Sequence, residues 1–410
     1  MRRGVLVVAC VASMVCVAPM GGAAAAPAPA EASAGAVGAA GAAAIIADPL
    51  VDFNGDGFAD LAVGVPGEDA NNGAGDTGGV SVIYGSAGGL SATATPDQFW
   101  TQDSPNVEGT AEANDDFGSA VASGDFNADG FTDLAIGVPG EDASATTDGG
   151  VNVIHGSAGG LSATATADQF WGQDSPGVED TAEDYDEFGS ALAAGDFNLD
   201  GFADLAVGVH YEDASAGNTG GVNVIHGSAA GLSATVLADQ FWTQDSPDVE
   251  GTAEPGDQFG FSLAVANFGG SWPHADLAIG VRYDGGGATS AGAVSVIYGS
   301  SAGLSATATP DQLWTQDSPD VEGTAGAWDG FGSALTTGDF NADFRSDLAI
   351  GVPSEDAPHT SDGGVNVIYG SLAALSATTT PDQFWGQDTP NVEDAAEASD
   401  YFGRELAAGS

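Results

Sequence analysis

The chain contains no lysine and only five arginines, although it has 410 residues and 59 acidic side chains. Its formal net charge is therefore −54. Nucleic acids and anionic membrane surfaces are bound through Lys and Arg, so neither is expected as a partner. Charged residues nevertheless make up only 16% of the chain and hydrophobic residues 43%, a balance that permits a core and argues against disorder.

Cysteine is almost absent as well. Cys10 and Cys16 lie in an apolar stretch that follows two arginines and precedes small, Pro-containing residues. This order is typical of a secretory signal peptide, so we expect residues 1–30 to be a leader cleaved near Ala25 or Ala30. The exported chain would then have neither disulfides nor thiolate chemistry.

No membrane span is expected, because the apolar run is short and no stop-transfer charges follow it. Residues 31–51 are rich in Ala and Gly without periodicity, and this composition predicts a flexible spacer. We therefore predict a secreted, extracellular and monomeric protein.

Helical periodicity is also missing, and the chain instead contains five copies of one unit. The phrase Asp-Phe-Asn-x-Asp-Gly begins at Asp52, Asp125 and Asp196, and its variants begin at Asn267 and Asp339. Phe-Gly pairs recur in the same frame, at Phe117, Phe188, Phe259, Phe331 and Phe402. Each unit adds a Leu-Ala-(Val/Ile)-Gly-Val run, a Val-(Ser/Asn)-Val-Ile run and a Trp-centred segment. Internal repetition on this scale indicates a repeat architecture.

The short runs are rich in β-branched and aromatic residues and are bounded by Gly, Pro, Asn and Asp, so they predict strands. Four strands per unit predict an all-β fold, a β-propeller with four-stranded blades, over residues 52–410. The expected blades are 117–187, 188–258, 259–330 and 331–401, and a first blade that combines 52–116 with 402–410. Such a C-terminal strand would close a five-bladed ring and remove the exposed sheet edge. Two alternatives stay open: residues 45–51 could compete for that edge, or the chain could be part of a larger propeller, so the number of blades is not settled by the sequence.

The aspartate phrases predict calcium sites. Oxygen-bearing side chains at positions 1, 3, 5 and 9, with Gly at 6, converge on one point, and calcium prefers six to eight oxygen ligands, a backbone carbonyl at position 7 included. The predicted ligands are Asp52, Asn54, Asp56, Phe58 (carbonyl) and Asp60; Asp125, Asn127, Asp129, Phe131 (carbonyl) and Asp133; and Asp196, Asn198, Asp200, Phe202 (carbonyl) and Asp204. Val63 stands where an EF-hand would have Glu, so these are strand-loop-strand sites. The alternative is that Asp, Asn and Gly merely form good turns.

The last two loops depart from this pattern. The loop at 267–276 is one residue longer and has lost two carboxylates, so we expect it to bind no calcium. The fifth loop keeps Asp339, Asn341, Asp343 and Asp347 as weaker candidate ligands, but Phe344 replaces the glycine and Arg345 adds a positive charge. Whether this fifth loop binds calcium stays open.

The Phe-Gly pairs, the Asp-x-Asn-x-Asp-Gly-x-x-Asp loops and the Gly-Val-Pro at Gly64 and Gly137 resemble the FG-GAP repeat, which builds the N-terminal β-propeller of integrin α chains. The resemblance covers nearly all of residues 52–410. It implies calcium in blade loops on one face and a ligand on the opposite face or rim. Integrin propellers have seven blades whereas five units occur here, and nothing resembles the metal-ion-dependent adhesion domain of integrins.

These observations predict a non-enzymatic, calcium-binding adhesion or ligand-binding module whose partner is an extracellular protein or a glycan. The alternative is the propeller of a secreted hydrolase, phospholipase D-like or glycan-active. An enzyme should break the repeat with an unmatched nucleophile, acid or metal cluster, and we find none. His155 and His226 take the strand position of Tyr84, so they predict a structural role. The recurring Glu-Asp pairs, such as Glu141-Asp142 and Glu212-Asp213, predict a solvated rim or outer calcium ligands.

Overall fold

The computed structural model describes residues 51–69, 75–214, 217–269, 273–285, 290–356, 360–393 and 395–408, and the backbone of Val7–Val8. No helix occurs in this part of the chain. Apart from Val7–Val8, the predicted leader and nearly all of the predicted spacer lie outside the described residues.

The strands form five antiparallel sheets. The first contains β1 (Val7–Val8), β2 (Leu61–Gly64), β3 (Val80–Ile83) and β4 (Gln98–Trp100). The second contains β5 (Val121–Gly124), β6 (Asp133–Val138), β7 (Gly150–Ile154) and β8 (Gln169–Trp171). The third contains β9 (Ala191–Gly195), β10 (Asp204–Val209), β11 (Gly221–Ile225) and β12 (Gln240–Trp242). The fourth contains β13 (Phe259–Ala266), β14 (Asp276–Val281), β15 (Ala293–Ser300), β16 (Gly303–Ser305) and β17 (Gln312–Trp314), and the fifth β18 (Ala334–Gly338), β19 (Asp347–Val352), β20 (Gly364–Gly370), β21 (Leu375–Ser376) and β22 (Gln383–Trp385).

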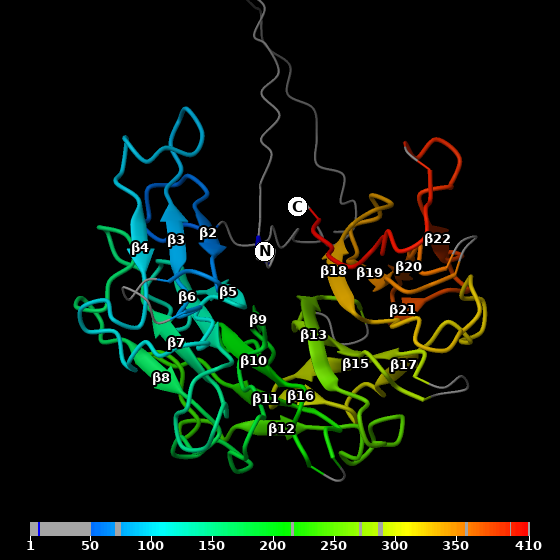
Figure 1. Cartoon of the computed structure of the whole chain (residues 1–410), viewed down its shortest axis with the longest axis horizontal. Helices are drawn as coiled ribbons and strands as arrows, with labels where there is room; N and C mark the ends of the chain where they lie inside the picture. The colour runs from blue at the N-terminus through cyan, green and yellow to red at the C-terminus, as the bar shows by residue number, and fades with distance from the viewer. Residues whose placement is uncertain are drawn as a thin grey trace, which may run out of the picture.

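The five sheets stand side by side in an arc, with the first sheet (blue) and the fifth (orange to red) at its two ends (Figure 1). The strands β9, β13 and β18 lie toward the centre of the arc, and β9 contacts both β5 and β13. An all-β fold of four-stranded antiparallel blades was the prediction from the sequence, and it is confirmed.

The expected closure of the ring is not found among the described residues. The edge of β2 is taken by β1, with Val7 opposite Gly64, and not by residues 402–408. Phe402 forms a bridge with Gly363, just before β20, as the Phe-Gly pair does with the preceding blade at every other junction. Phe402 and Leu406 pack against buried side chains of β19 and β20. Because no described residue of 402–408 pairs with β2, the closed ring stays a prediction.

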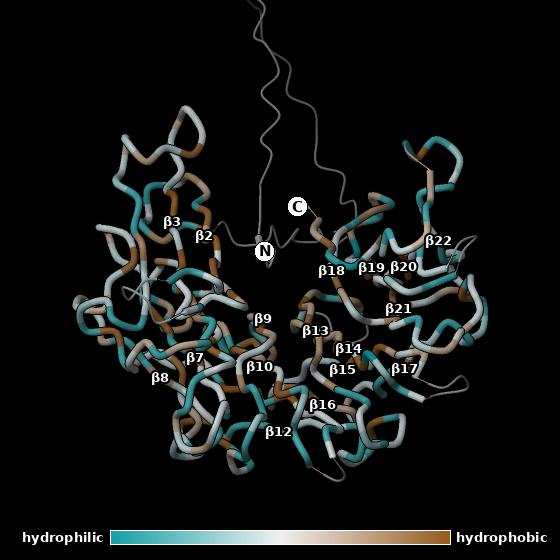
Figure 2. The backbone as a smooth tube through the Cα atoms, in the orientation of Figure 1, coloured by the Kyte–Doolittle hydropathy of each residue, from teal (hydrophilic) through white to brown (hydrophobic). Residues whose placement is uncertain are grey.

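The hydrophobic core lies between neighbouring sheets. One cluster joins Val80, Val82 and Tyr84 of the first blade to Ile136 and other side chains of the second, and three further clusters fill the next three junctions. The central strands are therefore buried on both faces, which explains why their sequences are continuously apolar. Figure 2 shows this as brown segments along the strands and teal in the loops.

Glycine residues allow the backbones of neighbouring blades to approach closely. A Cβ atom added at Gly137 of β6 would lie 2.1 Å from the carbonyl oxygen of Gly189, the glycine of the next Phe-Gly pair. The same approach recurs at Gly64, Gly208, Gly280 and Gly351. No side chain fits there, so both glycines of the repeat are required for blade packing.

Candidate functional site

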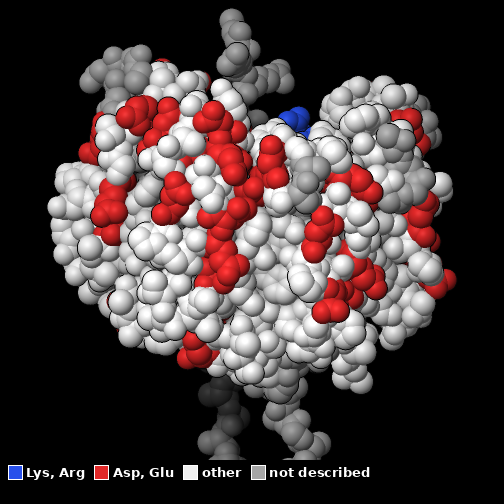
Figure 3. All heavy atoms as spheres, turned by 90° about the horizontal axis from the view of Figure 1, so that it is seen from below, with Lys and Arg blue, Asp and Glu red and all other residues white. Residues whose placement is uncertain are grey.

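The connections between strands fall on two faces, because each blade is an antiparallel meander. The aspartate-loop face carries the loops from the first to the second strand, at residues 52–60, 125–132, 196–203, 267–275 and 339–346. The opposite face carries the loops from the second to the third strand and those that lead into the next blade. Acidic side chains are spread widely over the view in Figure 3, where one small basic patch is visible.

Each aspartate loop is shaped by its own oxygen atoms. In the second loop, Asp125 Oδ1 accepts a hydrogen bond from Asp129 N at 3.1 Å and Asp125 Oδ2 accepts one from Gly130 N at 2.9 Å. Asn127 Oδ1 also accepts from Asp129 N, at 2.8 Å, and Asp129 Oδ1 accepts from Phe131 N, at 3.0 Å. The same pattern recurs around Asp52, Asn54 and Asp56, and around Asp196, Asn198 and Asp200. The structure thus gathers positions 1, 3 and 5 of the predicted sites into one turn in each of three blades.

The carboxylate at position 9 has a structural role that the sequence analysis missed. Asp133 is fully buried, and its two oxygens accept hydrogen bonds from Phe126 N at 3.0 Å and Gly156 N at 2.8 Å. It therefore ties the aspartate loop to the end of the third strand. Asp60, Asp204, Asp276 and Asp347 make equivalent pairs of bonds. Burial raises the pKa of Asp60 and of Asp347 to about 6.

These loops fit a divalent cation in the chemistry of their donors. A carboxylate oxygen has two lone pairs, so one that accepts a single N–H keeps the other for a metal ion. Every candidate ligand is a carboxylate, amide or carbonyl oxygen, which is the type that calcium prefers. The glycine at position 6 has φ of 85° in the first loop, 90° in the second and 92° in the third, as the tight turn requires.

The fifth loop keeps the turn but strains it. Phe344 has φ of 65°, so it adopts the left-handed conformation of the glycine that it replaces. Asp339 and Asn341 make the same backbone hydrogen bonds as their counterparts. Arg345 Nη1 lies 3.5 Å from Asp343 Oδ2, which places a positive charge beside the candidate ligands. In the fourth loop, residues 270–272 lie outside the described part, and Asn267 Nδ2 donates to His274 O at 3.0 Å.

Two histidines sit behind these loops. His155 Nδ1 lies 3.2 Å from Asp133 Oδ2, and His226 Nδ1 lies 3.2 Å from Asp204 Oδ1. Both rings are buried. Their burial against Asp133 and Asp204 agrees with the structural role expected from the sequence.

The opposite face carries carboxylate clusters that were not predicted from the sequence. In three places, one oxygen from each of three side chains lies within 4.8 Å of the other two; the groups are Glu112, Asp115 and Glu141; Glu183, Asp186 and Glu212; and Glu254, Asp257 and Asp284. None of the three groups contains an aspartate-loop residue. Donors of this kind could hold a metal ion. In each group the first two members come from the loop that enters the blade and the third follows the second strand.

The interpretation of Glu141 and Glu212 as a solvated rim is wrong. They are only 7% and 1% exposed, because each lies under the loop that enters its blade. Burial, reinforced by neighbouring carboxylates, raises the pKa of Glu141 to about 7 and that of Glu212 to about 8.

A buried glutamine supports each cluster. Gln173 Nε2 donates to Glu212 Oε2 at 2.6 Å and Gln244 Nε2 donates to Asp284 Oδ2 at 2.6 Å, while Gln102 makes the same contact with Glu141. The signal was present in the sequence, because every unit has Gln two residues after its tryptophan. Only the fold shows that this glutamine reaches a carboxylate about 40 residues further along the chain.

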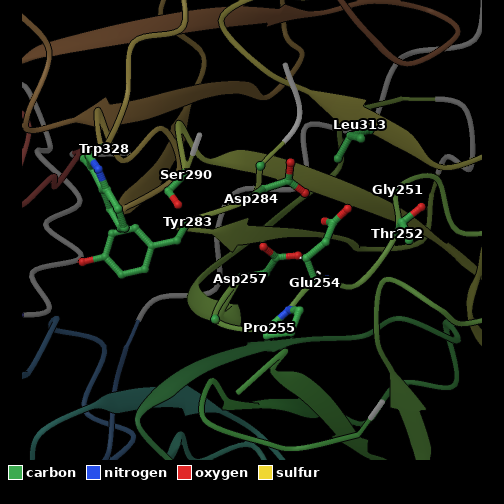
Figure 4. A pocket seen from close by; sticks show the side chains of 12 residues that line it. Gly251, Thr252, Glu254, Pro255, Asp257, Tyr283, Asp284, Ser290, Leu313 and Trp328 are labelled. Carbon is green, nitrogen blue, oxygen red and sulfur yellow. Dashed lines mark hydrogen bonds between the residues drawn. The ribbon is translucent and has the colours of Figure 1, made fainter. Parts of the chain in front are cut away.

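The third cluster opens into a cavity of about 800 Å³. Glu254, Asp257 and Asp284 point toward one another in it, and Tyr283 and Trp328 form its aromatic side (Figure 4). Trp328 was overlooked in the sequence, where it could have been found as a tryptophan outside the repeated Trp-centred segments.

The FG-GAP repeat family matches residues 48–83, 117–154, 188–225 and 331–369. The unit with the altered fourth loop lies between the matched ranges. The chain therefore carries FG-GAP repeats, and it resembles the N-terminal region of integrin α chains.

Curated relatives match over part of their length. The chain is 35% identical over 159 residues to phosphatidylinositol-glycan-specific phospholipase D of Bos taurus, which covers 38% of this chain and 17% of that protein. It is 30% identical over 240 residues to integrin alpha-V of Gallus gallus, which covers 56% of this chain and 19% of the integrin. The chain thus spans less than a fifth of the length of these relatives.

Among solved structures, the rhamnogalacturonan lyase of Bacillus licheniformis aligns with 77% of this chain and 60% of its own, with a TM-score of 0.35 and 11% identity. That similarity is too weak to indicate a shared fold or function. The described part of the chain has no helix long and apolar enough to cross a membrane.

Proposed function

We propose that this protein is a secreted, calcium-binding module that holds an extracellular protein or glycan on the opposite face of its blades and has no catalytic activity of its own. The observation that carries the proposal is the threefold recurrence of one oxygen-donor loop, with the same backbone hydrogen bonds in three blades. The leader-like residues 1–30 support its location outside the cell.

Calcium has a physical task in this proposal. Each complete loop holds carboxylates at positions 1, 5 and 9, and these repel one another unless a cation lies among them. When bound, a calcium ion would supply the positive charge that a chain with a net charge of −54 lacks at these turns. Asp125, Asn127 and Asp129 would hold it in the second blade, together with the carbonyl of Phe131 and with Asp133.

Native mass spectrometry tests the metal. The chain in excess calcium is expected to carry an ion for each of the three complete loops, and Asp129→Ala is expected to carry one ion fewer. Asn267→Ala, in the fourth loop, is the matched control and should leave the ion count unchanged. An unaltered count in Asp129→Ala would contradict the assignment.

A second function is favoured by one comparison. The relative named phosphatidylinositol-glycan-specific phospholipase D shares 35% identity over 159 residues, so this chain could instead act as the propeller of a secreted hydrolase. Assays of the purified chain against phosphatidylinositol-glycan and glycan substrates separate the two proposals. Turnover that is lost with a single carboxylate variant would favour the hydrolase.

A further inference from the structure

The cavity on the fourth blade is built unlike the equivalent positions of the other blades. Its aromatic side pairs Tyr283, from the loop after β14, with Trp328, from the loop that enters the fifth blade. The corresponding pairs at the other junctions are Gly67 and Asn114, Gly140 and Tyr185, Tyr211 and Gly256, and Ser354 and Ser399. The fourth junction alone brings two aromatic rings together at these positions, so the repeat itself does not require them.

Trp328 is more exposed than the tryptophans of the repeated Trp-centred segments. Its side chain is 58% exposed, whereas Trp100, Trp171 and Trp242 pack against the clusters between the blades. Its backbone has φ of 69°, and the equivalent residues Asn114, Tyr185, Gly256 and Ser399 also have positive φ, so the turn belongs to the repeat and the indole ring is what distinguishes this junction. A large apolar side chain left in water is not part of the core, and exposed apolar surfaces of this kind mark binding sites.

The aromatic side is held rigid. The rings of Tyr283 and Trp328 pack edge to face, with centroids 5.6 Å apart and planes at 71°. The guanidinium of Arg282 lies 4.9 Å from the centroid of Tyr283 and 4.5 Å from that of Phe261, and Tyr283 N donates to Asp257 O at 3.1 Å. A ring fixed before binding loses little entropy when a ligand arrives.

The acidic side provides acceptors at a fixed place. Asp257 and Asp284 are buried, and each accepts a hydrogen bond from the protein: Asp257 Oδ2 from Glu254 N at 2.7 Å, and Asp284 Oδ2 from Gln244 Nε2 at 2.6 Å. Glu254 is exposed and points into the same space (Figure 4). Each ionised carboxylate keeps lone pairs for hydroxyl donors, and such charge-assisted bonds are strong.

We propose that this cavity binds a neutral saccharide, whose C–H face stacks on Trp328 while its hydroxyl groups donate to the carboxylates of Glu254 and Asp284. The inference deepens the proposed function and rests on it, because it names the ligand class of the opposite face. Acidic sugars are disfavoured by the three carboxylates. Organic cations are disfavoured because the guanidinium of Arg282 already occupies the aromatic side.

The test is binding of the full chain, in calcium, to an array of neutral oligosaccharides, followed by titration of the strongest one as its free methyl glycoside. Trp328→Ala is expected to weaken binding at least tenfold and Trp328→Phe much less, because a phenyl ring still stacks. Glu254→Gln is expected to weaken binding severalfold. Trp385→Ala is the matched control, since Trp385 is a partly exposed tryptophan on β22, outside the cavity.

Intrinsic fluorescence gives an independent reading. The saccharide should shift the emission of the wild type and of Trp385→Ala but not that of Trp328→Ala. An array with no neutral saccharide bound, affinity unchanged by Trp328→Ala, or a preference for tetramethylammonium over every sugar would overturn the inference. Calcium counts by native mass spectrometry are measured on the same samples, so failure of the saccharide site is distinguished from failure of the proposed calcium-binding module.

Discussion

The two faces of the blades differ in how strictly they repeat. On the aspartate-loop face, the first three loops share the same hydrogen bonds, and the buried aspartate at position 9 makes its two bonds in all five blades. On the opposite face, the second residue after the second strand changes from Gly140 to Tyr211 to Tyr283. Donor geometry around a cation tolerates little variation, whereas a ligand-binding surface gains its specificity from variation.

The largest expected effect comes from removing calcium. An ion bound only by the folded chain stabilises it by mass action, by about 2.7 kcal/mol for each site at a hundredfold excess over Kd. We therefore expect excess chelator to lower Tm strongly in scanning calorimetry. Glu254→Gln, on the opposite face, should keep the full calcium-dependent shift in Tm. If the variant loses this shift, the stabilising calcium ions bind on the opposite face, and our account is contradicted.

The second-largest effect is expected from disturbing the close packing between neighbouring blades. Gly137→Ala would place a Cβ atom 2.1 Å from Gly189 O, so the second and third blades must separate. We expect a loss of about 1–3 kcal/mol in the free energy of unfolding, measured with urea. Gly285→Ala is the control, because an added Cβ meets nothing within 4 Å there. Equal stability of the two variants would refute the close contact.

A smaller effect, on pH dependence, is expected from a buried carboxylate between the first and second blades. Asp168 accepts hydrogen bonds from Glu108 N and Asn152 Nδ2, and burial raises its pKa to about 7. A raised pKa in the folded state means that the stabilising contribution is complete below about pH 4 and is lost as the pH rises through 7.

Asp168→Asn keeps the acceptor without the charge. At pH 8 it should be more stable than the wild type by on the order of 2 kcal/mol, and at pH 4 the two should be alike, as denaturant titrations at both values will show. Asp97→Asn, at the equivalent but exposed position of the first blade, should have no such effect. A constant difference across the pH range would argue against the raised pKa.

The smallest effect concerns the fifth loop. Phe344→Gly removes the strain of φ at 65° and should stabilise the chain by about 1 kcal/mol. If the strain limits calcium binding, native mass spectrometry should also show higher occupancy. Phe344→Ala removes the ring but keeps the strained conformation, so similar results for both variants would assign the effect to the side chain.

The sequence predicted the blades because a repeated run of β-branched and aromatic residues encodes strands locally. It also identified positions 1, 3 and 5 of the aspartate loops, since those residues are neighbours in the chain. It missed the clusters on the opposite face, such as Glu183 with Glu212, because their members meet only after the sheet has formed. The predicted closure of the ring is not found among the described residues: Phe402 contacts the fifth sheet as the Phe-Gly pair does at every junction, but residues 402–408 do not pair with β2.

The central claim is that the carboxylates of the aspartate loops are neutralised by calcium. The most direct measurement is a crystal structure of the chain grown in millimolar calcium, with anomalous scattering used to locate the ions. We predict anomalous peaks within the loops that begin at Asp52, Asp125 and Asp196. Water alone in those loops, or peaks only at the clusters around Asp115, Asp186 and Asp257, would contradict the account.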